Sequence, residues 1–123
     1  METALVVPAS CRAEGLPPVV NIETSMSSDV TVPLSFMLVC NMDDSVILTV
    51  SSSQSDEGGF YLIHKSGDML RYGLTVGNNL VLPLQQITIT PNQTYPTVLS
   101  FPAVSMKNYA GNYTGVVNFN FTY

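Results

Sequence analysis

The chain has 123 residues, a formal net charge of −5 at pH 7 and 11% charged residues, less than half of the roughly 25% that is usual. Its four basic residues are scattered (Arg12, Lys65, Arg71 and Lys107), so no nucleic-acid partner is expected. No apolar run approaches the roughly 18 residues of a membrane-spanning helix, so no membrane insertion is expected. The length fits one domain whose polarity comes mainly from neutral side chains.

Taken from the N-terminus, the sequence predicts short strands separated by turns. Residues 1–10 are expected to be a linker or N-terminal extension, or a first edge strand, because their apolar run stops at Pro8. Alternation is clearest over 30–40, where every second residue from Val32 to Leu38 is apolar. Residues 60–65 and 69–76 are predicted to pair as a hairpin. The predicted strands are 17–23, 30–40, 45–51, 60–65, 69–76, 80–84, 87–90, 97–106 and 110–123.

No window of the sequence shows a sustained helical period with caps at both ends. Short strands with turn signals every 8–12 residues or so are typical of antiparallel sandwiches. We therefore predict an all-β fold, an antiparallel β-sandwich of immunoglobulin-like architecture.

The segment 110–123 is the most regular predicted strand. Large apolar side chains alternate along it, and those that share one face are Val117, Phe119, Phe121 and Tyr123. An immunoglobulin-like sandwich has one more strand, G, beside this one, and no further strand follows in the sequence. Leaving four such side chains poorly covered would forfeit roughly 1.5–3 kcal/mol each. Two interpretations remain: an incomplete sandwich that accepts a strand from another chain, or a last strand in a closed or differently ordered sheet.

Residues that could carry chemistry are few. Cys11 and Cys40 are 29 positions apart and are expected to form a disulfide or to remain as two buried thiols. A zinc site lacks ligands, and the acidic pairs in turns lack calcium spacing, so no metal or other cofactor is expected. His64 is the single histidine, expected at the surface near the end of a strand, and no motif supplies it with a nucleophile. The sequence therefore predicts a protein that is not an enzyme.

Four features together resemble a known family. Gly111 precedes the alternating apolar residues and Tyr123 follows twelve residues later. Asp29–Cys40 carries an apolar–Pro–Leu sequence that leads to the cysteine. These features, with Cys11, are similar to the chaperone–usher pilus subunits of Gram-negative bacteria, where the tyrosine is usually penultimate rather than last. The resemblance implies a disulfide that joins Cys11, at the start of the first strand, to Cys40, at the end of the second.

Two further segments refine the resemblance, which covers Cys11–Tyr123. Residues 67–74 (GDMLRYGL) are similar to a motif in the spore coat protein U branch of pilins. Residues 5–11 (LVVPASC) resemble the linker of a type 1-like two-domain tip adhesin, in which a lectin domain leads into a pilin domain. This division implies a linker at 1–10 and a pilin domain at 11–123.

The resemblance also implies a function and a set of partners. A periplasmic chaperone would donate a strand beside the last strand, and the neighbouring pilus subunit would then replace it after passage through the outer-membrane usher. The protein would end in the fimbrium on the cell surface. The residues assigned to this acceptor site are Gly111, Val117, Phe119, Phe121 and Tyr123, with Val20 and Ile22 on the other side. The alternatives are an ordinary fimbrial subunit and a free-standing secreted immunoglobulin-like or carbohydrate-binding domain.

Overall fold

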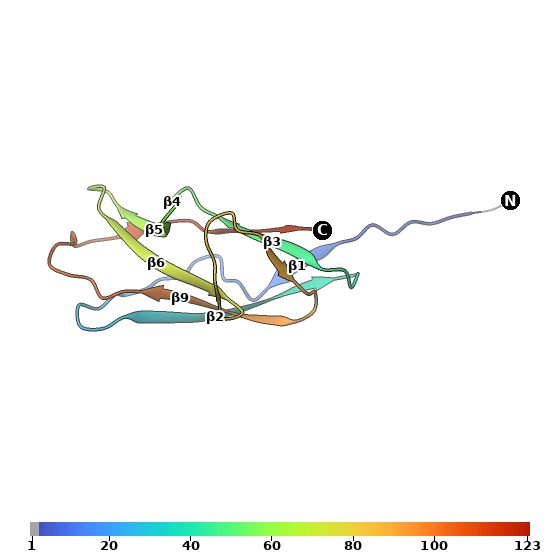
Figure 1. Ribbon diagram of the computed structural model, residues 1–123, viewed down its shortest axis with the longest axis horizontal. Coiled ribbons are helices and arrows are strands. Elements are labelled where there is room, and N and C mark those ends of the chain that lie inside the picture. Colours follow the sequence, from blue (N-terminus) through green and yellow to red (C-terminus); the bar gives the residue numbers. More distant parts are fainter. Residues whose placement is uncertain (1–2) are drawn as a thin grey trace.

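The computed structural model describes residues 3–123, so Met1 and Glu2 of the predicted linker lie outside the described residues. This part of the chain is all-β, as predicted, with antiparallel strands in two layers (Figure 1). Its strands are β1 Cys11–Glu14, β2 Val30–Cys40, β3 Val46–Ser51, β4 Ser55–Asp56, β5 Gly59–His64, β6 Met69–Val76, β7 Asn79–Leu80, β8 Ile87–Ile89, β9 Thr94–Phe101, β10 Tyr113–Thr114 and β11 Asn118–Thr122.

The strands form one large and one small sheet. The large sheet has the order β1-β2-β9-β6-β5-β10, with β4 beside β5 and β7 beside β6. The small sheet has the order β11-β3-β8. Residues 3–10 form no strand and extend away from the sandwich (Figure 1). No helix that could cross a membrane is found within residues 3–123.

The core lies between the two sheets and follows the predicted alternation. In β2, Phe36 and Leu38 are buried, and in β3 every second residue is buried. A period of two directs alternate side chains to the same face of a strand, which explains this pattern. The buried hydrophobic side chains are Phe36, Leu38, Val46, Leu48, Val50, Phe60, Tyr72, Leu74, Val76, Val81, Ile89 and Phe101.

Several predicted elements are confirmed. The strand at 30–40 has the predicted bounds, and β5 and β6 form the predicted antiparallel hairpin. Gly67 in its turn has φ +95°, a conformation that glycine adopts without steric cost. The Cys11–Cys40 disulfide is formed.

Three predicted strands are wrong in extent. Residues 17–23 form no ladder, since the prolines at 17 and 18 lack the N–H that pairing requires. The segment predicted at 80–84 pairs only through Leu80. Beyond it, the N–H of Val81 donates to Leu74 in the large sheet, and that of Leu84 donates to Val50 in the small sheet. This segment therefore crosses between the sheets instead of extending either one.

The third misjudged strand is β9. It was predicted at 97–106 but begins at Thr94 and ends at Phe101, directly before Pro102. Pro96 precedes the predicted strand but lies opposite Ser35 of β2, and the ladder with β6 begins only at Thr97. A proline is tolerated there because its missing N–H is not needed by β6.

The predicted strand 110–123 is divided into β10 and β11. β10 pairs with β5 in the large sheet, whereas β11 pairs with β3 in the small sheet. Between them, a side chain at Gly115 would come within 2.9 Å of Leu62, and the N–H of Val116 donates to the Gln54 side chain at 3.0 Å. The chain changes sheets at this contact, which no local pattern in the sequence signals.

Candidate functional site

The predicted acceptor strand ends in β11, an edge strand. It pairs with β3 from Asn118, opposite Ser51, to Thr122, opposite Ile47. Within residues 3–123 no strand lies along its other side, which we call the free edge of β11. An edge strand directs alternate N–H and C=O groups outward, where they can pair with another strand.

The apolar face of β11 is directed at the core, as the alternation predicts. Phe119 and Phe121 are half-buried, and their ring centroids lie 5.8 and 5.9 Å from that of Phe36 in β2. Val117, just before the strand, is also half-buried and packs against the core. In contrast, the core-facing residues of the neighbouring strand β3 are fully buried, with 0% exposure. The apolar side chains of β11 are therefore less covered than those of the strand beside it.

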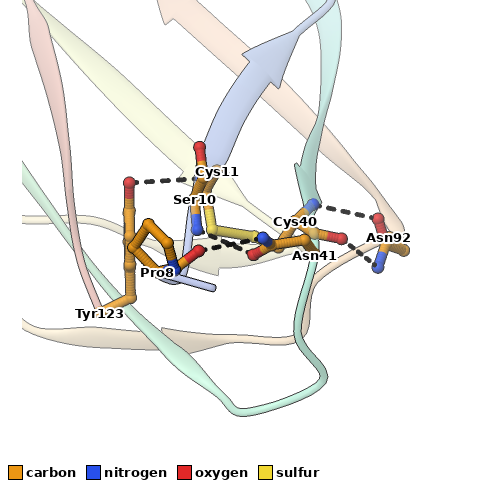
Figure 2. Close-up of a disulfide and its surroundings, with 7 residues drawn as sticks. All are labelled: Pro8, Ser10, Cys11, Cys40, Asn41, Asn92 and Tyr123. Carbon is orange, nitrogen blue, oxygen red and sulfur yellow. Dashed lines mark hydrogen bonds between the residues drawn. A yellow bond between two sulfur atoms is a disulfide. The ribbon is translucent and has the colours of Figure 1, made fainter. Parts of the chain in front are cut away.

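Tyr123 lies at the end of β11 and connects it to the other sheet. Its side chain follows the same alternation as Phe119 and Phe121, but the residue is 56% exposed. Its hydroxyl oxygen accepts the N–H of Cys11 in β1 at 3.2 Å (Figure 2). Tyr123 therefore connects the edge strands of the two sheets rather than filling the core.

The remaining predicted site residues lie in other parts of the fold. Val20 and Ile22 are half-buried in the irregular segment between β1 and β2, and Ile22 packs against the core. Gly111 precedes β10 and has φ +122°, and a side chain there would come within 3.0 Å of the His64 ring. A glycine is therefore needed at position 111, because the backbone has a positive φ there and passes close to the His64 ring of β5.

No sequence pattern predicts the polar groups around the disulfide. The Asn41 side chain accepts the N–H of Ser10 at 2.8 Å and donates to the carbonyl of Pro8 at 3.1 Å (Figure 2). On the other side, the Asn92 side chain accepts the N–H of Cys40 at 3.3 Å. An asparagine directly after a cysteine is a turn signal at most, so these contacts had no recognisable pattern.

A second polar cluster, also missed, surrounds Asp68 in the β5–β6 turn. Its carboxylate accepts hydrogen bonds from the Tyr113 hydroxyl, the Asn108 side chain and the N–H of Tyr109. These bonds hold the pKa of Asp68 below its ordinary value, the Tyr113 hydroxyl contributing most. Burial, followed by the bond to Asp68, raises the pKa of Tyr113 to about 12. These hydrogen bonds connect Asn108, Tyr109 and Tyr113 to the turn between β5 and β6.

The prediction of a surface position for His64 is wrong. His64 is only 7% exposed, and its ring stacks on Tyr109 at 5.7 Å and contacts Tyr113 at 5.1 Å. Its Nδ1 lies 2.8 Å from the Ser66 hydroxyl and also accepts the Ser66 N–H at 3.0 Å. The Ser66 contacts lie within the turn after β5, and the two tyrosine contacts give the ring a structural role in packing the segment before β10.

Acid is expected to destabilise the protein through Asp68 and through Asp56, whose pKa is lowered chiefly by its hydrogen bonds with Arg71. A folded-state pKa below the unfolded value gives stability that is present above the unfolded pKa, near 4, and is lost as pH falls through the folded pKa. The urea midpoint should therefore fall between about pH 5 and pH 3. The Asp68→Asn variant should show a smaller fall. An equal fall in variant and wild type would contradict a role for Asp68.

The fold is shared with proteins of pilus assembly. No family model matches the sequence, and no curated protein matches it. One similar solved chain belongs to the CsuC–CsuE chaperone–tip adhesion subunit pre-assembly complex of archaic chaperone–usher Csu pili from Acinetobacter baumannii, with a TM-score of 0.60 and 16% identity. Another belongs to a chaperone–tip adhesin complex of CFA/I fimbriae biogenesis, with a TM-score of 0.54 and 18% identity.

The coverage of these matches is unequal. The alignments cover 95% and 91% of this chain but only 40% and 42% of the solved chains. This chain therefore spans about two fifths of the length of those proteins. At this level of identity, the comparison establishes a common fold.

Proposed function

We propose that this chain is a fimbrial assembly module that accepts a strand from another protein along the free edge of β11. The observation that carries the proposal is the unequal burial of the core-facing side chains in the small sheet. Phe119 and Phe121 are half-buried, while the core-facing side chains of β3 are fully buried. A strand added beside β11 would cover the two rings and pair with the outward backbone groups, as in β-augmentation.

In this proposal the added strand comes first from a periplasmic chaperone and then from a neighbouring pilus subunit delivered through an outer-membrane usher. The fold supports this assignment, because both solved structures named above are chaperone complexes of pilus tip subunits. The protein would then reside in a fimbrium at the cell surface, where it contributes to adhesion, and would act by assembly rather than by catalysis.

We further propose that the chain is the pilin domain of a two-domain tip adhesin. Residues 3–10 support this role because they form no strand, while Asn41 fixes the backbone of Pro8 and Ser10. A segment held at its base in this way is suited to connect two domains in a defined direction. That the alignments cover only two fifths of the tip-complex chains is consistent with such a part.

The test is binding of a synthetic peptide of about nine residues in which valine and threonine alternate, a length typical of strands. The wild-type chain should form a one-to-one complex, measured by native mass spectrometry. Phe119→Asp should abolish binding while the disulfide still forms, since a charge on the core face of β11 opposes burial. The matched control is Thr122→Asp, on the exposed face of the same strand, which should still bind.

Two results would contradict the proposal. One is the absence of a complex between the wild-type chain and the alternating peptide. The other is equal binding by Phe119→Asp and wild type, because the added strand would then not depend on the apolar face of β11. A peptide with the same composition but with its valines and threonines in two blocks controls for nonspecific hydrophobic association.

A further inference from the structure

The hydrogen bond between the Tyr123 hydroxyl and the N–H of Cys11 lies at the Cys11–Cys40 pair of the β1–β2 ladder. Cys11 is directly opposite Cys40, and their Cα atoms are 4.2 Å apart. Opposite residues this close form the non-hydrogen-bonded type of antiparallel pair, in which both residues direct their N–H and C=O groups away from each other. The contacts agree, because the N–H of Cys40 reaches Asn92 and that of Cys11 reaches Tyr123 (Figure 2).

The N–H of Cys11 therefore points out from the edge of the large sheet. Within residues 3–123, β1 pairs with β2 alone, so this is the side on which another strand's carbonyl would normally accept it. The hydroxyl oxygen of Tyr123 occupies that acceptor position. Because Tyr123 directly follows β11, one side chain connects the outer edge of β1 to the end of the free edge of β11.

We propose that this hydrogen bond, which we call the Tyr123 contact, limits how far an added strand can extend along the module. The inference rests on the proposed function and concerns the same edge. An added strand can pair with β11 over Asn118–Thr122 without disturbing the Tyr123 contact. A residue added beyond that point must compete with the Tyr123 hydroxyl for the N–H of Cys11. Tyr123 would thus be a positioning residue that sets the length and register of the strand that fits.

The test is a series of alternating valine–threonine peptides extended one residue at a time, at either end, since a strand can add in either direction. With the wild-type chain, affinity should rise with length and then stop rising. With Tyr123→Phe, which keeps the ring, the longer peptides should gain about fivefold more affinity, the value of one hydrogen bond. The matched control is Tyr109→Phe, an exposed tyrosine outside β11, which should behave like the wild type.

A second readout needs no peptide. Amide hydrogen exchange of Cys11 should be slower in the wild-type chain than in Tyr123→Phe by about fivefold, because only the former has the acceptor. Identical length dependence in both chains, or identical exchange at Cys11, would overturn the Tyr123 contact as a limit while leaving strand addition intact. Failure of every peptide to bind the wild-type chain would overturn the proposed function and this inference together.

Discussion

Replacement of Cys11 and Cys40 by serine is expected to lower the free energy of unfolding by about 3–4 kcal/mol, as the chain-entropy model gives for a bridge across 29 residues. In the structure, the edge strand β1 depends strongly on this disulfide. β1 has four residues, is mostly exposed and pairs with β2 alone within the described chain. Without the disulfide, we expect β1 to detach and the Tyr123 contact to be lost.

The measurement is chemical denaturation of the double variant and of the wild-type chain with and without reductant. The reduced wild type should behave like the double variant, which separates loss of the bridge from effects of the serine side chains. A decrease in the free energy of unfolding of no more than about 1 kcal/mol would contradict this dependence on the disulfide, since it is small beside the roughly 5–15 kcal/mol of a typical domain. It would mean that the short β1–β2 ladder holds the strand without help.

Phe36→Ala is expected to cost about 3–5 kcal/mol, the usual range for a fully buried phenylalanine. Phe36 is 1% exposed, and its ring centroid lies 5.7 Å from that of Tyr95 and 5.8 and 5.9 Å from those of Phe119 and Phe121. Its removal leaves a cavity directly beneath Phe119 and Phe121. Phe36→Leu should cost less, because it refills part of that volume.

Phe119→Ala tests the same layer from the other side. Because Phe119 is half-buried in the chain alone, its removal should cost only about 1–2 kcal/mol. When a strand is bound beside β11, the cost should approach that of Phe36→Ala, since the ring is then fully covered. Denaturation of both variants with and without the alternating peptide measures the difference. Equal costs in the two conditions would show that the added strand does not cover Phe119.

The elements that sequence analysis predicted well are those whose pattern is local. The burial of β2 alternates from Val30 to Leu38, and the strand has the predicted bounds. The β5–β6 hairpin has its turn residues in place, and the apolar face of β11 follows directly from the alternation after Val117. In each case the residues that determine the element lie within it, so a period of two was sufficient.

The errors concern contacts between distant segments. The division of 110–123 into β10 and β11 depends on Gln54, which is 62 residues before Val116, and on Leu62, which is well over forty residues before Gly115. The burial of His64 depends on Tyr109 and Tyr113, which reach it through the polar cluster around Asp68. No residue near His64 signals those partners. Tertiary contacts of this kind override local propensity.

The same limit applies to the proposed acceptor site. The alternation predicted which side chains of β11 point inward, but only the sheet order identifies β11 as an edge strand. The hydrogen bond between the Tyr123 hydroxyl and the N–H of Cys11 is likewise evident only from the fold, because the two residues are 112 positions apart. The other side of the proposed site, Val20 and Ile22, remains a prediction.

The most direct test of strand acceptance is the melting of a fusion in which an alternating valine–threonine strand follows Tyr123 through a short flexible linker. If the free edge of β11 accepts a strand, the fusion should melt at least about 10 °C above the chain alone, which corresponds to roughly 3 kcal/mol for a domain of this size. A fusion with the same residues in two blocks should melt like the chain alone. Equal melting temperatures for all three proteins would contradict strand acceptance by the free edge of β11.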